Sequence, residues 1–103
     1  MVEHRHGVRR RAFALAEIFT KSGIHLTGLI YNVSRDGMFI LTDSKVHIRG
    51  YVEIHLPKII RDNKPFKISG LVIHHSGIGF GLMFSRATNE TIEFVDKLSL
   101  HMI

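Results

Sequence analysis

The segment Ala12–Val33, AFALAEIFTKSGIHLTGLIYNV, decides the fold because it contains two strand-like stretches separated by a turn. In the second stretch, alternate residues fall on opposite faces of an extended chain. One face carries Ile24, Leu26, Gly28 and Ile30, and the other carries His25, Thr27, Leu29 and Tyr31. Lys21-Ser22-Gly23 has the composition of a tight turn. The segment therefore predicts a β-hairpin with strands at Ala12–Thr20 and Ile24–Val33.

Further short segments with strand character follow at fairly even spacing. They are Met38–Leu41, Tyr51–Leu56, Phe66–His75 and Ile78–Phe84. The residues from Asn32 to Gly37 predict a tight turn, because Asn, Ser and Asp side chains bond to their own backbone and Gly tolerates unusual backbone angles. With the first hairpin, these segments predict a small antiparallel barrel or sandwich.

The pattern becomes helical near the end of the chain. Apolar residues recur with a period of 3.6 residues, at Ile92, Phe94, Val95, Leu98 and Met102. Asn89 is the expected N-cap, and Glu90 lies in the first turn, where the helix dipole favours acids. We therefore expect an amphipathic helix over about residues 89–102. Its apolar stripe covers its own barrel or pairs with a second chain, and we favour the first use.

Composition limits the chain to one domain. It has 103 residues, of which 45% are hydrophobic and 22% charged, and no Cys. The absence of Cys excludes disulfides and thiolate metal sites. We see no segment long enough to insert in a membrane and no signal-like stretch after Met1, so we expect a cytoplasmic protein.

Positive charge is concentrated at the start of the chain. Residues 1–11 contain Arg5, Arg9, Arg10 and Arg11 against Glu3, a net charge of +3 out of +5 for the whole chain. Guanidinium groups grip phosphate or the O6/N7 edge of guanine through paired hydrogen bonds. We interpret residues 1–11 as a basic arm that is either simply solvated or part of a ligand site, and residues 12–103 as the folded domain.

Signatures of enzymes are missing from the sequence. It contains no P-loop, no His-Glu-x-x-His and no Gly-x-Ser-x-Gly elbow. His74 and His75 are adjacent on a predicted strand and point to opposite faces, and His4 with His6 is a weak pair for a metal. We therefore expect a binding protein without a metal, a cofactor or a catalytic residue.

Two motifs carry a family resemblance. Arg5-x-x-x-Arg9 is followed by Asn32-x-Ser34-x-x-Gly37, and the stretch Gly77–Phe84 resembles a typical last strand of the same family. Together they resemble the PilZ domain over roughly Arg5 to Leu100. The resemblance implies an all-β fold, a six-stranded antiparallel barrel of the split-barrel type with a C-terminal helix, that binds cyclic di-GMP and signals without chemistry.

The resemblance also implies roles for the motif residues. Arg5 and Arg9 would engage phosphates and the Hoogsteen edges of the guanines. Asn32 and Ser34 would make polar contacts from the barrel surface, and Gly37 would keep the turn tight. Further candidate ligand residues are His4, Arg10 and Gly79. The residue before the first Arg is His4, and it leaves open whether one or two nucleotides bind.

Two other functions stay open at this point. The same barrel could act as an adaptor through an unidentified protein partner, with nucleotide binding weak or lost. A small basic barrel could also bind RNA or single-stranded DNA. Against the second function, we expect most aromatic residues to lie in the core rather than on a stacking surface. They are Phe13, Phe19, Phe39, Phe66 and Phe80. Whether the chain forms a homodimer is open.

Overall fold

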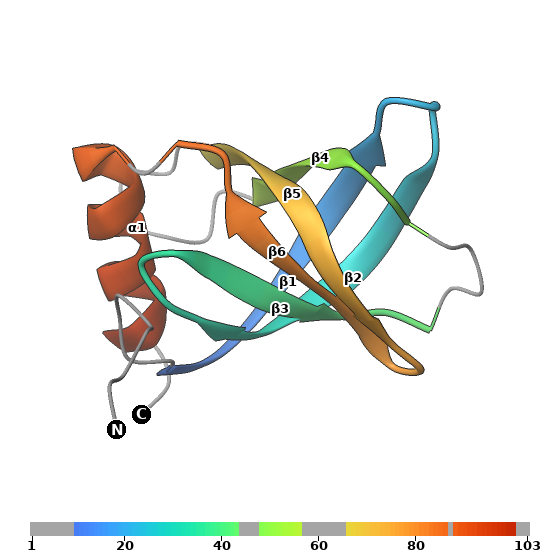
Figure 1. Ribbon diagram of the computed structural model, residues 1–103. Helices are drawn as coiled ribbons and strands as arrows, with labels where there is room; N and C mark the ends of the chain where they lie inside the picture. Colours follow the sequence, from blue (N-terminus) through green and yellow to red (C-terminus); the bar gives the residue numbers. More distant parts are fainter. Residues whose placement is uncertain (1–9, 44–47, 57–65, 87, 101–103) are drawn as a thin grey trace, which may run out of the picture.

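The fold is a closed six-stranded antiparallel β-barrel with one C-terminal helix, as predicted (Figure 1). A computed structural model describes residues 10–43, 48–56, 66–86 and 88–100. The strands are β1 (Arg10–Thr20), β2 (His25–Val33), β3 (Gly37–Leu41), β4 (Tyr51–Leu56), β5 (Phe66–Ser76) and β6 (Gly79–Phe84), and the helix is α1 (Asn89–Leu100). Around the barrel the strands follow the order β1-β2-β3-β6-β5-β4.

The first strand is longer than the sequence predicts. β1 begins at Arg10, where the prediction was Ala12, and its first residues pair with the end of β2: Arg10 lies opposite Val33, and Arg11 lies opposite Asn32. Arg10 and Arg11 therefore belong to the barrel wall rather than to the basic arm. Residues 1–9, including His4, Arg5 and Arg9, lie outside the described residues.

The predicted turn between the first two strands is confirmed. The Gly23 N–H donates to the Thr20 carbonyl at 3.1 Å, and the Thr20 N–H donates to the Ile24 carbonyl at 3.0 Å. Gly23 has a φ of 94°, a left-handed conformation that glycine adopts without steric cost. The hairpin is thus set by local turn chemistry.

Alternating side chains fill the barrel interior. Along β1 the inward residues are Ala12, Ala14, Ala16 and Ile18, each at most 5% exposed. They meet larger inward residues from the other strands, including Ile30, Ile40, Ile54, Phe80 and Leu82. Small side chains on one strand leave room for large ones on the facing strands, and in this way side chains fill the interior of a small barrel.

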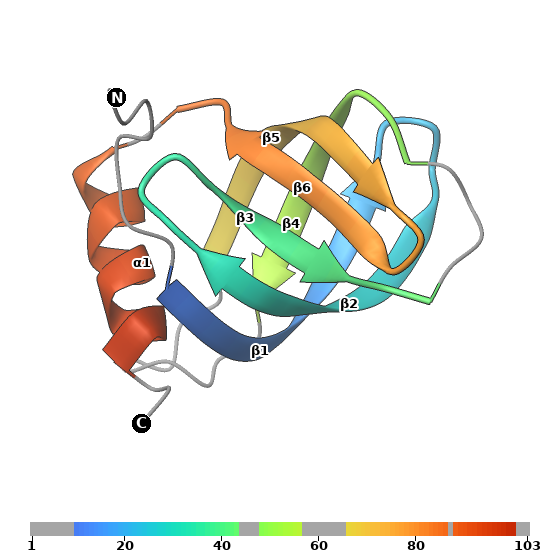
Figure 2. The same ribbon diagram turned by 60° about the horizontal axis from the view of Figure 1, so that its bottom comes forward.

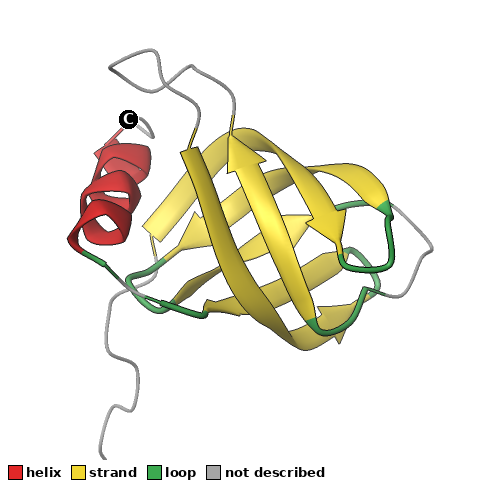
Figure 3. Cartoon of the chain, turned by 90° about the horizontal axis from the view of Figure 1, so that it is seen from above, coloured by secondary structure: helices red, strands yellow, loops and turns green. Residues whose placement is uncertain are grey.

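The helix closes one end of the barrel (Figures 1 and 3). Phe94, Val95 and Leu98 are buried in the same cluster as the inward strand residues, and the Phe94 ring stacks on Phe66 with centroids 4.1 Å apart. This confirms that the apolar stripe of the helix covers its own barrel.

The N-cap of the helix is Thr88, not Asn89 as predicted. The Thr88 Oγ1 accepts a hydrogen bond from the Thr91 N–H at 3.2 Å, and its carbonyl accepts from the Ile92 N–H at 3.0 Å. Both Thr and Asn are good N-caps, so the sequence preference alone does not separate two adjacent candidates.

Three of the five aromatic residues expected in the core lie on the outer wall instead. Phe13 is 60% exposed, and Phe19 and Phe39 are half-buried between inward-facing neighbours. Phe80 is fully buried, and Phe66 packs against the core from a partly buried position. The strand phase decides this, because the alternate residues Ala12 and Ala14 take the inward positions and Phe13 is left facing outward.

Candidate functional site

The predicted Asn-x-Ser-x-x-Gly turn lies at the end of the barrel that α1 covers, next to the start of β1 (Figures 1 and 2). The pairing of Arg10 with Val33 fixes this neighbourhood, because Val33 is the last residue of β2 before the turn. The structure thus places the beginning of the first strand and the polar turn side by side on one part of the outer wall.

The turn is held by its own hydrogen bonds. The Ser34 N–H donates to the Gly37 carbonyl at 2.8 Å, and the Asp36 N–H donates to the Ser34 Oγ at 3.2 Å. The Asp36 carbonyl accepts from the Phe84 N–H at 2.8 Å, which ties the turn to the end of β6. Ser34 is only 4% exposed. Its hydroxyl therefore shapes the turn, and the neighbouring Arg35 is the exposed residue of the Ser34–Gly37 segment.

Gly37 is explained by its packing against β6. A Cβ atom at this position would lie 2.0 Å from the Leu82 carbonyl oxygen, far inside any allowed contact. Gly37 is therefore required by the β3–β6 pairing, whatever else binds nearby.

Gly79 does not join the other candidate residues. It pairs with Leu41, at the opposite end of the β3–β6 ladder from the Gly37–Met83 pair. The two pairs are four residues apart along the strands, a distance of about 14 Å. A Cβ at Gly79 would lie 2.1 Å from the Ile40 carbonyl oxygen, so this glycine too is required by packing.

Asn32 reaches the outer wall through a bulge. The register of β2 against β3 shifts between Ile30 and Asn32, and the β1–β2 register shifts between Arg11 and Ala14. Ile30 and Val33 are buried, whereas Tyr31 and Asn32 between them are both half-buried. The bulge breaks the strict alternation and brings two consecutive side chains to the outside, as bulges near binding sites often do.

Arginines surround this part of the wall. Arg10 is exposed, and its Nη1 lies 3.9 Å from the Asp96 Oδ1 on α1. Arg35 is exposed within the turn, and Arg11 is exposed opposite Asn32. Positive charge and hydrogen-bonding groups at one place suit a small anion with polar edges.

Arg11 is the residue that sequence reasoning missed, because it was assigned to the arm. Its Cζ lies 4.5 Å from the centroid of the Tyr31 ring, and the Phe13 ring meets Tyr31 edge-on at 5.9 Å. A signal for this placement exists in the sequence, since Arg11, Phe13 and Leu15 alternate with Ala12, Ala14 and Ala16. That alternation extends the first strand back to Arg11.

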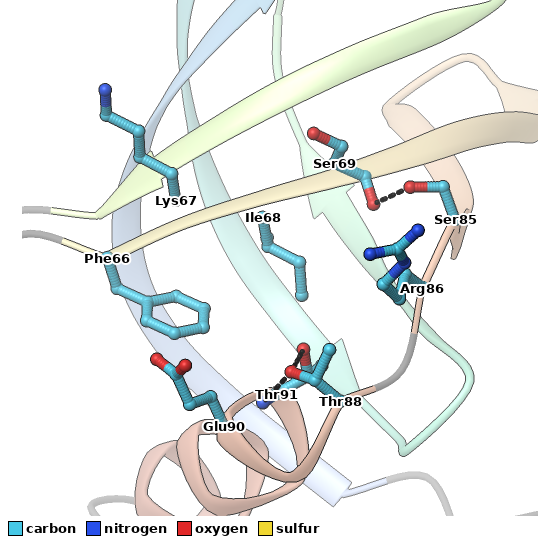
Figure 4. A pocket seen from close by; sticks show the side chains of 9 residues that line it. All are labelled: Phe66, Lys67, Ile68, Ser69, Ser85, Arg86, Thr88, Glu90 and Thr91. Carbon is cyan, nitrogen blue, oxygen red and sulfur yellow. Dashed lines mark hydrogen bonds between the residues drawn. The ribbon is translucent and has the colours of Figure 1, made fainter.

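A separate cavity of about 520 Å³ lies between β5, the residues after β6 and the start of α1 (Figure 4). Within the described part of the chain, no predicted ligand residue lines it. Four of its polar residues bond in pairs: Ser85 Oγ donates to the Ser69 carbonyl at 3.2 Å, and the Thr88 and Thr91 hydroxyls are 3.1 Å apart. Lys67 points away from the other lining side chains. These contacts identify no ligand.

The described residues contain neither a cluster of metal-ligating side chains nor a membrane-spanning helix. No group of three or more His, Asp or Glu side chains in this part of the chain is arranged to hold a metal ion. No helix among the described residues has the length and apolar character needed to cross a membrane.

Comparison with known proteins agrees with the fold. The family model of the PilZ domain matches residues 3–100. The PilZ domain of CeSA from a cellulose-synthesizing bacterium has 16% identity and a TM-score of 0.71, with 92% of this chain and 97% of that chain covered. The PilZ domain of Escherichia coli YcgR, solved with c-di-GMP, has 11% identity and a TM-score of 0.75, with 97% and 92% covered.

A third similar structure is longer than this chain. The Bacillus subtilis inhibitor of motility, MotI/DgrA, has 13% identity and a TM-score of 0.70, and the match covers 97% of this chain but 51% of that protein. At these identities the structural likeness shows the fold. No curated protein matches the chain in sequence.

Proposed function

The chain belongs to the PilZ domain family, and we propose that it is a receptor that binds cyclic di-GMP on the outer wall of the barrel and signals without chemistry. The observation that carries the proposal is the meeting of β1 and the Asn32–Gly37 turn at one end of the barrel. The E. coli YcgR domain, which has the same fold, was solved with this nucleotide.

The proposed ligand residues are the two motifs and their surroundings. Asn32 contacts a guanine edge from the wall, and the exposed Arg35 of the Ser34–Gly37 turn pairs with a phosphate. Arg5 and Arg9 lie outside the described residues, and Arg9 precedes Arg10 by one peptide bond in the sequence. Arg10 pairs with Val33, the last residue of β2 before the turn. Arg9 is bonded to Arg10, so its proposed contact with the nucleotide needs no long stretch of intervening chain.

The charge of the site matches the ligand. Cyclic di-GMP carries two phosphate charges and two planar purines, and guanidinium groups pair with phosphate and stack on rings. Arg11 and Arg35 are exposed on this part of the wall. We expect the affinity to fall as salt is added, because exposed charge pairs are screened.

In this proposal the nucleotide bridges residues 1–11 and the turn, and the altered surface is what a protein partner recognises. Hydrogen exchange with and without nucleotide tests this part. Slower exchange in residues 1–11 and in the Asn32–Gly37 turn would support it, and unchanged exchange in both would contradict it.

Isothermal titration calorimetry tests the binding itself. We expect saturable heat for the wild-type chain with cyclic di-GMP, and weaker binding for Asn32→Ala and for Arg5→Ala with Arg9→Ala. Arg49→Ala is the control, since Arg49 is exposed just before β4 and away from the turn. No heat from the wild type, or equal heat from all variants, would refute the proposal.

Single-stranded RNA or DNA is a second candidate ligand. Nucleic-acid binding was disfavoured because the aromatic residues were expected in the core. The Phe13 ring is instead exposed next to Tyr31 and Arg11, where it could stack on a base. A gel shift with mixed oligonucleotides separates the two functions. Oligonucleotide binding by a chain that gives no heat with cyclic di-GMP would favour this candidate.

A further inference from the structure

We propose that Arg11, supported by the Tyr31 ring, is a stacking seat for one guanine of the bound nucleotide. The inference rests on the cyclic di-GMP binding proposed above and adds residues that neither motif contains. In this arrangement the base lies on the outer face of the Arg11 guanidinium, and the Tyr31 ring lies behind the guanidinium.

The position of the seat follows from strand pairing. Arg11 on β1 lies opposite Asn32 on β2, and Tyr31 precedes Asn32 in the chain. Because the bulge turns both Tyr31 and Asn32 to the outer wall, a base whose edge contacts Asn32 has the Arg11 side chain beside it.

The Arg11 side chain lies against an aromatic ring. Its Cζ lies 4.5 Å from the Tyr31 ring centroid, within the range of a cation–π contact. Among the described residues no acidic side chain lies within ion-pairing distance of Arg11, whereas Arg10 lies 3.9 Å from Asp96. The Arg11 charge is therefore available to a ligand, and its geometry is set by an aromatic ring.

Phe13 borders the seat on its apolar side. Its ring meets the Tyr31 ring at an angle of 70° and is 60% exposed. An exposed ring beside a guanidinium suits a planar base better than a phosphate, because stacking uses the faces of rings and planar cations. The seat thus favours a nucleobase.

The test is calorimetry of the full chain with cyclic di-GMP. We expect Tyr31→Leu and Arg11→Lys each to lower the affinity by roughly fivefold or more, the lower end of what loss of one stacked base causes. Lysine keeps the charge but not the planar group, so Arg11→Lys separates stacking from simple charge attraction. Tyr31→Phe keeps the ring and should bind as the wild type does.

The chain supplies a matched control. Lys21 and Tyr51 form a second cation–π pair, with 5.7 Å from the Lys21 Nζ to the ring centroid. This pair is near the other end of β1, about 30 Å along the strand from Arg11. Tyr51→Leu and Lys21→Ala should leave the affinity unchanged.

Tyrosine fluorescence gives an independent measurement. The chain has no Trp and two Tyr, so Tyr51→Phe leaves Tyr31 as its only emitter. We expect the nucleotide to change that emission saturably, with the same midpoint as the calorimetry. In Tyr31→Phe, the remaining Tyr51 should show only the linear loss caused by nucleotide absorption.

The results distinguish this inference from the proposed function. If the wild type binds and Arg11→Lys and Tyr31→Leu bind within twofold of it, the seat is refuted and the receptor function stands. If the wild type does not bind, both fail. Circular dichroism checks that each variant is folded, and Arg11→Lys decides the question if Tyr31→Leu is not, because Arg11 is exposed.

Discussion

Replacing Gly37 with alanine should destabilise the barrel even without any ligand. The new Cβ would lie 2.0 Å from the Leu82 carbonyl oxygen and 3.0 Å from its carbonyl carbon. These are backbone atoms, so no side-chain rotation relieves the overlap, and β3 and β6 must separate by about 1 Å to restore normal contact. Overpacking of this kind costs about 1 to 3 kcal/mol, and we expect a value at the upper end because backbone must move.

Chemical unfolding measures the effect, because linear extrapolation of urea curves followed by circular dichroism gives the free energy of unfolding. Gly79→Ala should behave alike, since its Cβ would lie 2.1 Å from the Ile40 carbonyl oxygen. Gly81→Ala and Gly77→Ala are the controls. The nearest atom to a Cβ at Gly81 is 3.7 Å away, and nothing lies within 4 Å at Gly77. Both should stay within about 0.5 kcal/mol of wild type.

The reasoning is refuted if Gly37→Ala is as stable as wild type, or if Gly81→Ala is destabilised equally. The result also bears on the ligand site. If Gly37→Ala binds cyclic di-GMP poorly, the loss counts as a ligand effect only when it exceeds the part explained by unfolding.

Other predictions concern the helix cap, the core and the turn. Thr88→Ala should lower the free energy of unfolding by about 1 kcal/mol, because Thr88 caps the helix. Asn89→Ala should lower it by less than half of that, and equal losses in urea curves would contradict this. Phe94→Ala should cost about 3 to 5 kcal/mol, since the ring is 5% exposed and stacked, and a loss below 1 kcal/mol would be inconsistent with that packing. Ser34→Ala should cost about 1 kcal/mol without nucleotide, because a turn N–H loses its acceptor, and an unchanged thermal midpoint would argue against that role.

Local chemistry made much of the fold predictable. The turn at Gly23 depends on neighbouring residues and on one left-handed glycine, and the helix is visible in the period of its apolar residues. The six strands follow from their short, even spacing. The strand ends were predicted less well: β1 begins two residues before the expected start.

The facing of the aromatic residues was not predictable from the pattern alone. Residues 12–15 are Ala, Phe, Ala and Leu, which are all apolar. Either set of alternate residues could therefore face the core. The choice depends on how much space the lumen leaves, which is set by strands distant in the sequence. Bulges have a similar origin, and the bulge that turns Tyr31 and Asn32 outward has no local sequence signal that we can identify.

The candidate site was predictable in part. The spacing of Asn32, Ser34 and Gly37 predicted a turn, and the structure places all three together, with Ser34 and Gly37 occupied in holding that turn. Which of them touches the nucleotide stays a prediction. The place of Arg11 depends on pairing between β1 and β2, and spacing within the first motif does not contain that information.

The alanines on the inner face of β1 have a consequence for how ligand binding could change the structure of the barrel. The alanines are buried in one cluster with larger side chains of the facing strands, including Ile30, Phe80 and Leu82, and close-packed interiors of this kind resist rearrangement. In the proposed receptor, we therefore expect a ligand on the outer wall to leave the packing of the interior unchanged. On the proposed function, we expect a protein partner that recognises the nucleotide-bound form to dock on the outer wall close to the nucleotide.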